Sequence, residues 1–427
     1  MRTHAKFAAV AIGGLALMLG ACGGGETVTE VVEVPVDVPA ETTPAETAAP
    51  VAEGDNVLTI WVDETRYGPV RAAADEYIAA NPGTVINLVQ KNFDDIRTDF
   101  ISQVPTGEGP DITVCAHDWT GELVANGVVA PIELGDARAG FEPVAVDAFT
   151  WDGQVYAVPY AIENIALIRN TDLAPEAPAT WDDMIAMAND AGTQFPVLLQ
   201  VSADGDAFHM YPFQTSFGAP VFEQNADGSY NSTLAMGGAN GEAFANWLSD
   251  QGAAGVLSAD VTYDIATEQF NQGNSPFVVG GPWMLSSFTN VPNIAIDPLP
   301  TAGGETASPF VGVQGFCVSS QSQNALVAND FLVNSIGTED AQVALAAAGD
   351  RPPALTAAQA TAFANDTSGF MQGFSTVGAT GVPMPSIPEM NQVWAFWGVT
   401  QADIIEGVAD PAATWDQMVT DVRNAIG

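Results

Sequence analysis

Apolar runs and helical patterns alternate along the chain from residue 57 onward. Residues 57–62 form a continuous apolar run, which is typical of a strand covered on both faces. Pro69 opens a helix whose apolar side chains recur at helical spacing. The pattern continues with a strand at 84–90, a helix over 96–104 and a strand at 111–115. This order predicts parallel strands with helices on both faces of the sheet.

The same alternation returns in the second half of the chain. Thr180-Trp181-Asp182-Asp183 has the form of a capping box, with Asp183 in the acidic role, and predicts the start of a helix. The further predicted elements are a turn at 225–228, a helix around 244–248, strands at 277–279 and 310–318, and helices at 338–348, 393–406 and 413–425. The chain is therefore expected to be an α/β protein with more than one sheet.

The first 55 residues follow a different pattern. A short basic start and an apolar run at 7–19 precede Cys22, which predicts a secretory signal over residues 1–21. The Leu-Gly-Ala-Cys ending looks like a bacterial lipobox, in which Cys22 is lipidated; the alternative is an ordinary signal with an incidental cysteine. The run is shorter than the roughly 20 residues of a membrane-spanning helix. Residues 22–55, rich in Val, Glu, Pro and Thr, predict an extended, disordered acidic tether.

The composition excludes some classes of binding partner and indicates where the protein is located. The chain carries 52 acidic and 10 basic residues, for a formal net charge of −42. Such a chain repels the phosphates of nucleic acids and anionic lipid headgroups. Its hydrophobic fraction of 47% is that of a folded protein, and its length favours two lobes. We expect a protein outside the cytoplasmic membrane, periplasmic or on the cell surface, with an acidic surface suited to a salty habitat.

The sequence offers few residues for metal or covalent chemistry. After the signal there are two histidines, His117 and His209, in unrelated contexts, which is too few ligands for a structural zinc site. Sequence signatures of serine hydrolases, Walker loops and dinucleotide-binding folds are absent. We therefore expect no catalytic residue, metal or cofactor. Cys115 and Cys317 could pair, but their apolar surroundings slightly favour two buried free thiols.

Aromatic residues beside carboxylates or turn residues suggest a sugar site. A sugar ring has an apolar C–H face, which suits an aromatic plane, and a rim of hydroxyls, which suits carboxylates. Trp61 and Trp247 lie within apolar periods and are expected in a core, whereas Trp283 follows Gly280-Gly281-Pro282 and is not. The other aromatic residues placed this way are Trp119 near Asp118, Tyr211 near Asp206, and Trp394 and Trp397 near Glu389.

Residues 107–118, GEGPDITVCAHD, resemble the maltose/maltodextrin-binding proteins of ABC importers, within the family 1 extracellular solute-binding proteins. The resemblance covers residues 56–427, with further blocks in the family's order at 150–153, 160–163, 180–181, 281–283, 309–313, 385–390 and Trp394. It implies a periplasmic-binding-protein-like fold, in which crossing hinge strands join two α/β lobes and a ligand cleft lies between them. The implied lobes are an N-terminal one at 56–161 and 316–362 and a C-terminal one at 162–315 and 363–427.

The resemblance also implies which residues contact the sugar. These are acids that bind hydroxyls, their neighbours, and aromatic planes that stack on sugar rings: Asp63, Arg66, Tyr67, Asp118, Trp119, Glu163, Asp206, Phe208, Tyr211, Trp283 and Trp394. The chain departs from the family pattern at three positions. Cys115 stands where the family has a stacking Trp, and Trp119 and Gly398 stand where it has Arg. Trp119 either replaces the stacking surface or packs in the core.

The implied function is that of a lipid-anchored substrate-binding protein of a carbohydrate ABC transporter. It would bind maltose or maltodextrins by lobe closure, act as a monomer and deliver the sugar to the permease subunits without catalysis. One alternative in the same class is a binding protein for another oligosaccharide or a polyol. The alternatives from other classes are a secreted glycoside hydrolase and a surface adhesion or structural lipoprotein.

Overall fold

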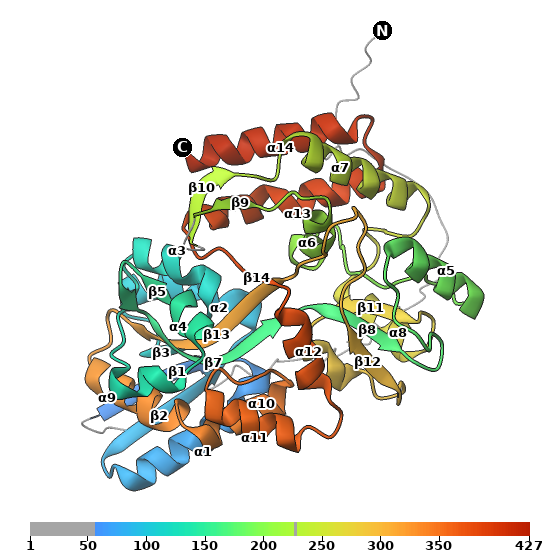
Figure 1. The fold of residues 1–427 in the computed structure, drawn as a ribbon. Coiled ribbons are helices and arrows are strands. Elements are labelled where there is room, and N and C mark those ends of the chain that lie inside the picture. Colours follow the sequence, from blue (N-terminus) through green and yellow to red (C-terminus); the bar gives the residue numbers. More distant parts are fainter. Residues whose placement is uncertain (1–55, 226–228) are drawn as a thin grey trace, which may run out of the picture. The chain divides into compact units, whose positions relative to one another are not determined.

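The computed structural model describes residues 56–225 and 229–427 (Figure 1). Its largest sheet has seven strands in the order β14-β13-β3-β1-β2, with β4 and β7 also paired to β13. These strands are β1 (Asn56–Val62), β2 (Thr84–Gln90), β3 (Ile112–Ala116), β4 (Val129–Ala130), β7 (Ala157–Asn164), β13 (Phe310–Ser319) and β14 (Val382–Pro383). Strand β1 pairs in parallel with β2 and β3, which confirms the predicted parallel pairing. Strand β13 runs antiparallel to β3 and β7.

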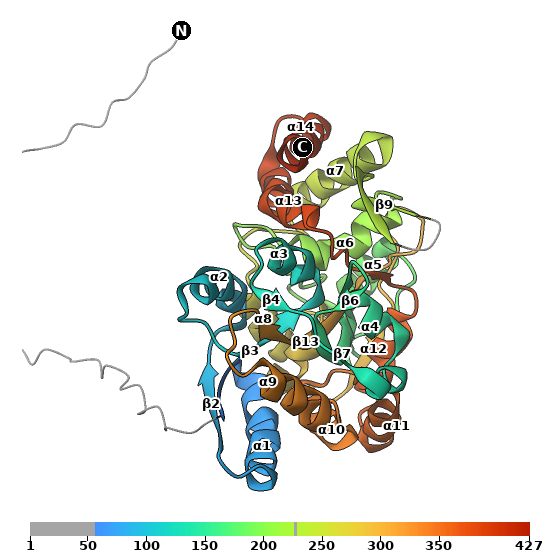
Figure 2. The ribbon, with the colours of Figure 1, turned by 90° about the vertical axis from the view of Figure 1, so that its left-hand side faces the viewer.

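Seven helices pack around this sheet in the described residues. They are α1 (Glu64–Ala80), α2 (Phe93–Gln103), α3 (Thr120–Ala125), α4 (Pro143–Ala148), α9 (Ala325–Phe331), α10 (Glu339–Gly349) and α11 (Thr356–Asn365). The sequence predicts three of them, α1, α2 and α10. Helices α1, α10 and α11 lie side by side at the bottom of both ribbon views (Figures 1 and 2). The predicted start of α1 at Pro69 is wrong. Asp63 accepts a hydrogen bond from the Arg66 amide and caps the helix, so the helix begins at Glu64 and includes Pro69.

A second sheet has three strands in the order β11-β8-β12, all antiparallel. Its strands are β8 (Ala166–Asn170), β11 (Phe277–Gly280) and β12 (Ile294–Asp297), and two small hairpins join β5 (Thr150–Trp151) to β6 (Gln154–Val155) and β9 (Phe222–Gln224) to β10 (Tyr230–Leu234). The helices of this part are α5 (Trp181–Ala191), α6 (Ala207–Ser216), α7 (Gly238–Ala253), α8 (Tyr263–Asn271), α12 (Phe370–Gly378), α13 (Glu389–Gly407) and α14 (Pro411–Ile426). The capping box at Thr180 is confirmed. The predicted turn at 225–228 lies mostly outside the described residues.

Residues 56–225 and 229–427 form two large hydrophobic cores and two smaller ones. The first large core lies under the seven-stranded sheet, and the second collects the aromatic residues of α5, α6, α7, α13 and α14. Strand β13 contributes to both, because Phe310 belongs to the second core and Phe316 to the first. The chain passes between the cores a second time at the end of β7, because Ala161 on β7 belongs to the first core and Ile165, the residue after the strand, belongs to the second. Strand β13 and the segment from β7 to Ile165 therefore connect the cores, as hinge segments would, while the lobe boundaries given above stay a prediction.

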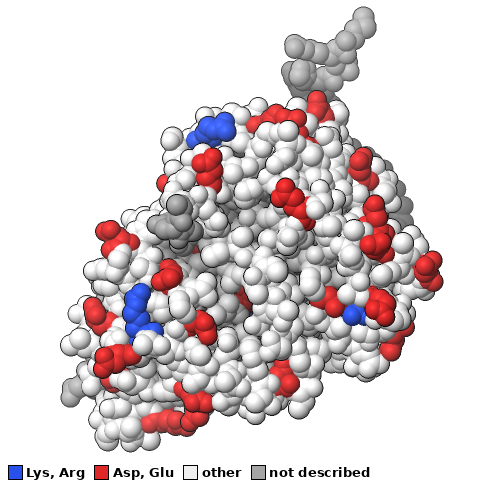
Figure 3. Space-filling view, viewed as in Figure 1, with Lys and Arg blue, Asp and Glu red and all other residues white. Residues whose placement is uncertain are grey.

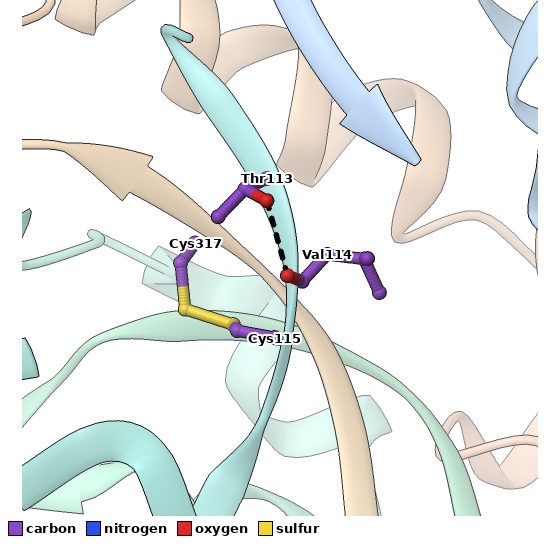
Figure 4. The surroundings of a disulfide bond; sticks show 4 residues. All are labelled: Thr113, Val114, Cys115 and Cys317. Carbon is purple, nitrogen blue, oxygen red and sulfur yellow. Dashed lines mark hydrogen bonds between the residues drawn. A yellow bond between two sulfur atoms is a disulfide. The ribbon is translucent and has the colours of Figure 1, made fainter. Parts of the chain in front are cut away.

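The expected free thiols are wrong, because Cys115 and Cys317 form a disulfide (Figure 4). Cys115 lies on β3 and Cys317 on β13, and the antiparallel register sets Cys317 opposite Thr113, two residues from Cys115. Both cysteines are buried, which explains their apolar surroundings. The sequence showed this burial but could not show that the two strands are neighbours. In the described residues, no helix is both long and apolar enough to cross a membrane.

Candidate functional site

The first two candidate acids stand at the same edge of the large sheet. Asp63 directly follows β1, and Asp118 follows β3 in the short 3-10 helix η2 (His117–Trp119). Because β1 and β3 are parallel neighbours, their carboxyl ends meet at one edge, where α/β proteins commonly bind ligands. Burial raises the pKa of Asp118 to about 6, although Arg97 opposes the shift. A carboxylate so placed gains from any hydroxyl that donates to it.

Arg66 is buried beside Asp63 and does not point freely into solvent. Its side chain is 3% exposed and forms an ion pair with Asp63. It also donates to the Tyr160 hydroxyl and, over 3.2 Å, to Gln314 Oε1. Its guanidinium lies over the Phe93 ring at 5.0 Å. Because each guanidinium nitrogen already donates a hydrogen bond and the charge is paired with Asp63, Arg66 orients Asp63 and Gln314.

The predicted Tyr67 and Trp119 lie beside this group. Tyr67 is partly buried and packs against the first core. Trp119 is buried, with its ring centroid 5.1 Å from that of Phe93. Since Cys115 is in the disulfide and fully buried, it cannot supply the stacking surface that the family has there. Of the two interpretations of Trp119, packing fits its burial better.

Glu163 lies on β7 and is the most strongly paired acid of the group. Gln314 Nε2 donates to its Oε1 at 2.8 Å, and Arg351 forms an ion pair with its Oε2. Burial alone would raise the pKa of Glu163, but the charge and hydrogen bond of Arg351, with help from Arg66, hold it below its usual value. Glu163 therefore stays charged although it is buried.

Trp283 lies on the other side of Arg351. It belongs to the 3-10 helix η4 (Pro282–Ser287), which begins after Gly280-Gly281. A Cβ atom on Gly281 would overlap the Trp283 ring, so glycine is needed for the indole to fold over this backbone. The Arg351 guanidinium lies over the same ring at 5.7 Å from its centroid, within the range of a cation–π contact. Arg351 thus connects Glu163 to the candidate stacking plane.

Asp206 caps helix α6 and is surrounded by donors. Its Oδ1 accepts from the His209 amide at 3.0 Å, and its Oδ2 accepts from His209 Nδ1 at 3.0 Å and from Gln200 Nε2. Burial would raise the pKa of Asp206, but the contacts with His209 lower it below the usual value. The loop before it packs directly on α13, because a Cβ atom on Gly205 would overlap the Gly398 carbonyl. A glycine at 398, in place of the family's arginine, leaves room for this loop.

The aromatic candidates form one continuous group around Phe310. Phe208 is partly buried, with ring centroids 6.2 Å from Trp283 and 6.3 Å from Phe310. Tyr211 stacks on Phe310 at 3.6 Å and is only 1% exposed, so it supports the group from inside. Trp394, on α13, is partly buried and lies 6.4 Å from Phe310. Trp397 is fully buried and donates through Nε1 to Gln214 Oε1 at 2.9 Å.

Contacts therefore link most predicted site residues into one chain. They run from Asp63 and Arg66 through Gln314 to Glu163, and then to Arg351, Trp283, Phe208, Phe310 and Trp394. Sequence reasoning missed the connecting residues Gln314, Arg351 and Phe310. A polar residue inside the apolar run of β13 was the available signal for Gln314. In the described parts of the chain, no group of three His, Cys, Asp or Glu residues is placed to hold a metal ion.

The chain is similar to a family of bacterial proteins and to individual sugar-binding proteins. The family of bacterial extracellular solute-binding proteins matches residues 72–372. The maltodextrin-binding protein MdxE of Bacillus subtilis (strain 168) is 26% identical over 358 residues, which cover 80% of this chain and 84% of that protein. A galactooligosaccharide-binding protein of the same organism is 24% identical over 391 residues, covering 86% and 89%.

A solved structure gives the same result at the level of the fold. The structure titled Thermus thermophilus maltotriose binding protein bound with maltotriose matches with a TM-score of 0.77 and 30% identity, covering 87% of this chain and 100% of that chain. The predicted α/β fold of the periplasmic-binding-protein type is therefore confirmed. The chain belongs to the bacterial extracellular solute-binding proteins and is the sugar-binding, non-enzymatic component of an ABC transporter.

Proposed function

We propose that the chain binds maltodextrins outside the cytoplasmic membrane and delivers them to a membrane permease. The observation that carries this proposal is the continuous group of acids and aromatic rings from Asp63 to Trp394. Asp63, Asp118 and Glu163 would accept hydrogen bonds from sugar hydroxyls. Trp283 and Trp394 would stack on the apolar ring faces. The similarity to a maltodextrin-binding and a maltotriose-binding protein supports this sugar class.

The other candidate residues take supporting roles in this proposal. Arg66 and Tyr211 are buried and would hold Asp63 and the aromatic group in place. Phe208 would extend the stacking surface beside Trp283. The remaining predicted residues would shape the edges of the site, and they are Tyr67, Trp119 and Asp206.

A galactooligosaccharide is the second candidate ligand, since a relative that binds one is almost as similar. Isothermal titration calorimetry with maltose, maltotriose, maltoheptaose, a galactooligosaccharide and a polyol separates the candidates. We expect heat and tight binding with maltotriose and maltoheptaose. Heat only with the galactooligosaccharide would move the proposal to that sugar. The release of new reducing ends from maltoheptaose would contradict simple binding.

Binding is proposed to proceed by closure of the two predicted lobes. Strand β13, which contributes to both cores, and the segment from β7 to Ile165, which passes from the first core to the second, would act as the hinges. A sugar that contacts both sides stabilises the closed form in proportion to its preference for that form. X-ray scattering of the isolated protein should show a smaller radius of gyration with the preferred sugar than without it. Identical profiles would contradict closure.

The predicted lipid anchor at Cys22 lies outside the described residues and is part of the proposal. A tether of residues 22–55 would keep the binding protein near its permease at a high effective concentration. Expression in a bacterial host with radioactive palmitate should label the wild-type chain and leave Cys22→Ala unlabelled. Equal labelling of both would contradict the anchor.

A further inference from the structure

Two buried polar atoms beside Asp206 have no hydrogen-bond partner within residues 56–225 and 229–427. They are His209 Nε2 and Gln200 Oε1. The His209 side chain is almost completely buried, with the residue 5% exposed. A buried polar atom without a partner typically costs about 1–3 kcal/mol, so such atoms are expected to meet a water or a ligand.

The contacts of Asp206 determine the chemical character of both atoms. Asp206 Oδ2 faces His209 Nδ1 at 3.0 Å and also accepts from Gln200 Nε2. A charged carboxylate only accepts, so Nδ1 carries a proton, and in the Nδ1–H tautomer of the imidazole Nε2 is left as an acceptor. Turning the Gln200 amide would set its oxygen against the carboxylate, which fixes Oε1 as the second acceptor. Both unpartnered atoms therefore require O–H or N–H donors.

These acceptors lie beside the candidate stacking plane. The His209 ring stands edge-to-face with Trp283, with centroids 6.0 Å apart and an interplanar angle of 85°. It is also edge-to-face with Phe208 at 5.4 Å. A sugar ring that stacked on Trp283 would bring its hydroxyls, which are donors, to this end of the aromatic group.

We propose that His209 and Gln200 select the sugar by accepting hydrogen bonds from its hydroxyls, and that Asp206 orients both side chains. The inference rests on the proposed function and extends it, because it assigns recognition to two residues that sequence reasoning did not select. The occupant is a neutral polyhydroxylated ligand. An analogue without the relevant hydroxyls would leave the two acceptors unpaired.

Two substitutions of His209 distinguish direct recognition of the sugar through Nε2 from support of Asp206 through Nδ1. His209→Asn keeps a donor near the Nδ1 position and loses Nε2, whereas His209→Gln keeps an amide at the Nε2 position and loses the Nδ1 donor. We expect His209→Asn to weaken binding of the preferred sugar of the panel by about tenfold and His209→Gln by about threefold or less. Gln200→Met, which removes the second acceptor, should weaken binding by a similar factor to His209→Asn.

The measurement is the dissociation constant from calorimetry, with the melting temperature of each sugar-free variant as a control for folding. The reverse order, with His209→Gln the weaker binder, would show that His209 acts only through Asp206 and would overturn the inference. Wild-type affinity in all three variants would assign the two atoms to a buried water and would also overturn it. If the wild-type protein binds no sugar of the panel, the proposed function fails, and this inference fails with it.

Discussion

At the scale of single residues, Asp118 is predicted to lower stability at neutral pH. Its pKa is raised by burial from 3.8 to about 6, so the folded protein binds the proton more tightly than the unfolded chain does. The stability that the folded protein gains from binding this proton more tightly is fully present below pH 3.8 and is lost as the pH rises to about 6. We expect Asp118→Asn to be more stable than wild type at pH 7, by about 1–2 kcal/mol for a half-buried side chain. Urea denaturation of both proteins at pH 7 measures this difference in the free energy of unfolding.

The neighbouring His117 is predicted to have the opposite pH dependence. Burial lowers its pKa from 6.5 to about 4, and its ring accepts from the Val313 amide and donates to the Met384 carbonyl. The stability it contributes is present above pH 6.5 and is lost as the pH falls to about 4, by up to about 3 kcal/mol. Wild-type stability should therefore change little between pH 6.5 and 4, because the two slopes oppose each other.

The two variants make this cancellation visible. In Asp118→Asn the unfolding free energy should fall steeply on acidification, since the slope of His117 is no longer opposed. In His117→Gln it should stay level or rise over the same range. Parallel pH profiles for wild type and both variants would show that neither group titrates as its surroundings indicate.

Residue patterns located the acids and aromatics of the site but not the residues that join them. Asp63 and Glu163 could be found because they match a family pattern along the chain. Gln314 and Arg351 could not, since each gains its role from a contact with Glu163, 151 and 188 positions away in sequence. Contacts over such separations depend on strand pairing, which the local pattern does not contain.

At the scale of elements, the disulfide between β3 and β13 should be a main source of stability. It closes a loop with a sequence separation of 202, and removing such a link typically costs about 2–5 kcal/mol. We expect the double variant Cys115→Ala/Cys317→Ala to unfold at lower guanidinium concentration than wild type. Added dithiothreitol under unfolding conditions should lower the wild-type midpoint and leave that of the double variant unchanged. An unchanged wild-type midpoint would indicate that the thiols do not pair in solution.

The close packing of the loop before Asp206 on α13 gives a second prediction at this scale. Gly205 has a φ of 72° and no room for a Cβ atom, because the Gly398 carbonyl fills that space. Gly255 has a similar φ of 70° with nothing within 4 Å, so it is a matched control for backbone strain alone. Gly205→Ala should lower the melting temperature and weaken sugar binding much more than Gly255→Ala. Equal effects would mean that the loop can move away without cost.

Elements were predicted well where periodicity was strong and less well at their ends. The strands β1, β2 and β13 were located to within one or two residues by their apolar runs. The start of α1 was misplaced at Pro69, which is a typical first-turn residue, whereas the helix is capped by Asp63, six residues earlier. The two large cores are connected by β13 and by the segment from β7 to Ile165, and no periodicity shows that connection.

At the scale of the whole molecule, acidic residues far outnumber basic ones, with 52 against 10 along the chain. Carboxylates are spread over the face seen in Figure 3, with few basic side chains among them. Several basic residues cannot neutralise surface carboxylates, because they are buried in ion pairs with acids. These residues are Arg66, Arg169 and Arg351. Much of the formal charge of −42 is therefore left without positive partners at the surface, and it should repel itself.

Screening of this repulsion should stabilise the fold without changing sugar affinity. Raising NaCl from 0.01 M to 1 M shortens the Debye length from about 30 Å to about 3 Å, so the melting temperature should rise with salt. A neutral sugar has no net charge to be screened, and its dissociation constant should change by less than about twofold over the same range. Scanning calorimetry and sugar titration at matched salt concentrations measure the two quantities. A melting temperature that falls with NaCl would show that specific ion pairs, such as Arg169–Asp297, matter more than the summed surface charge.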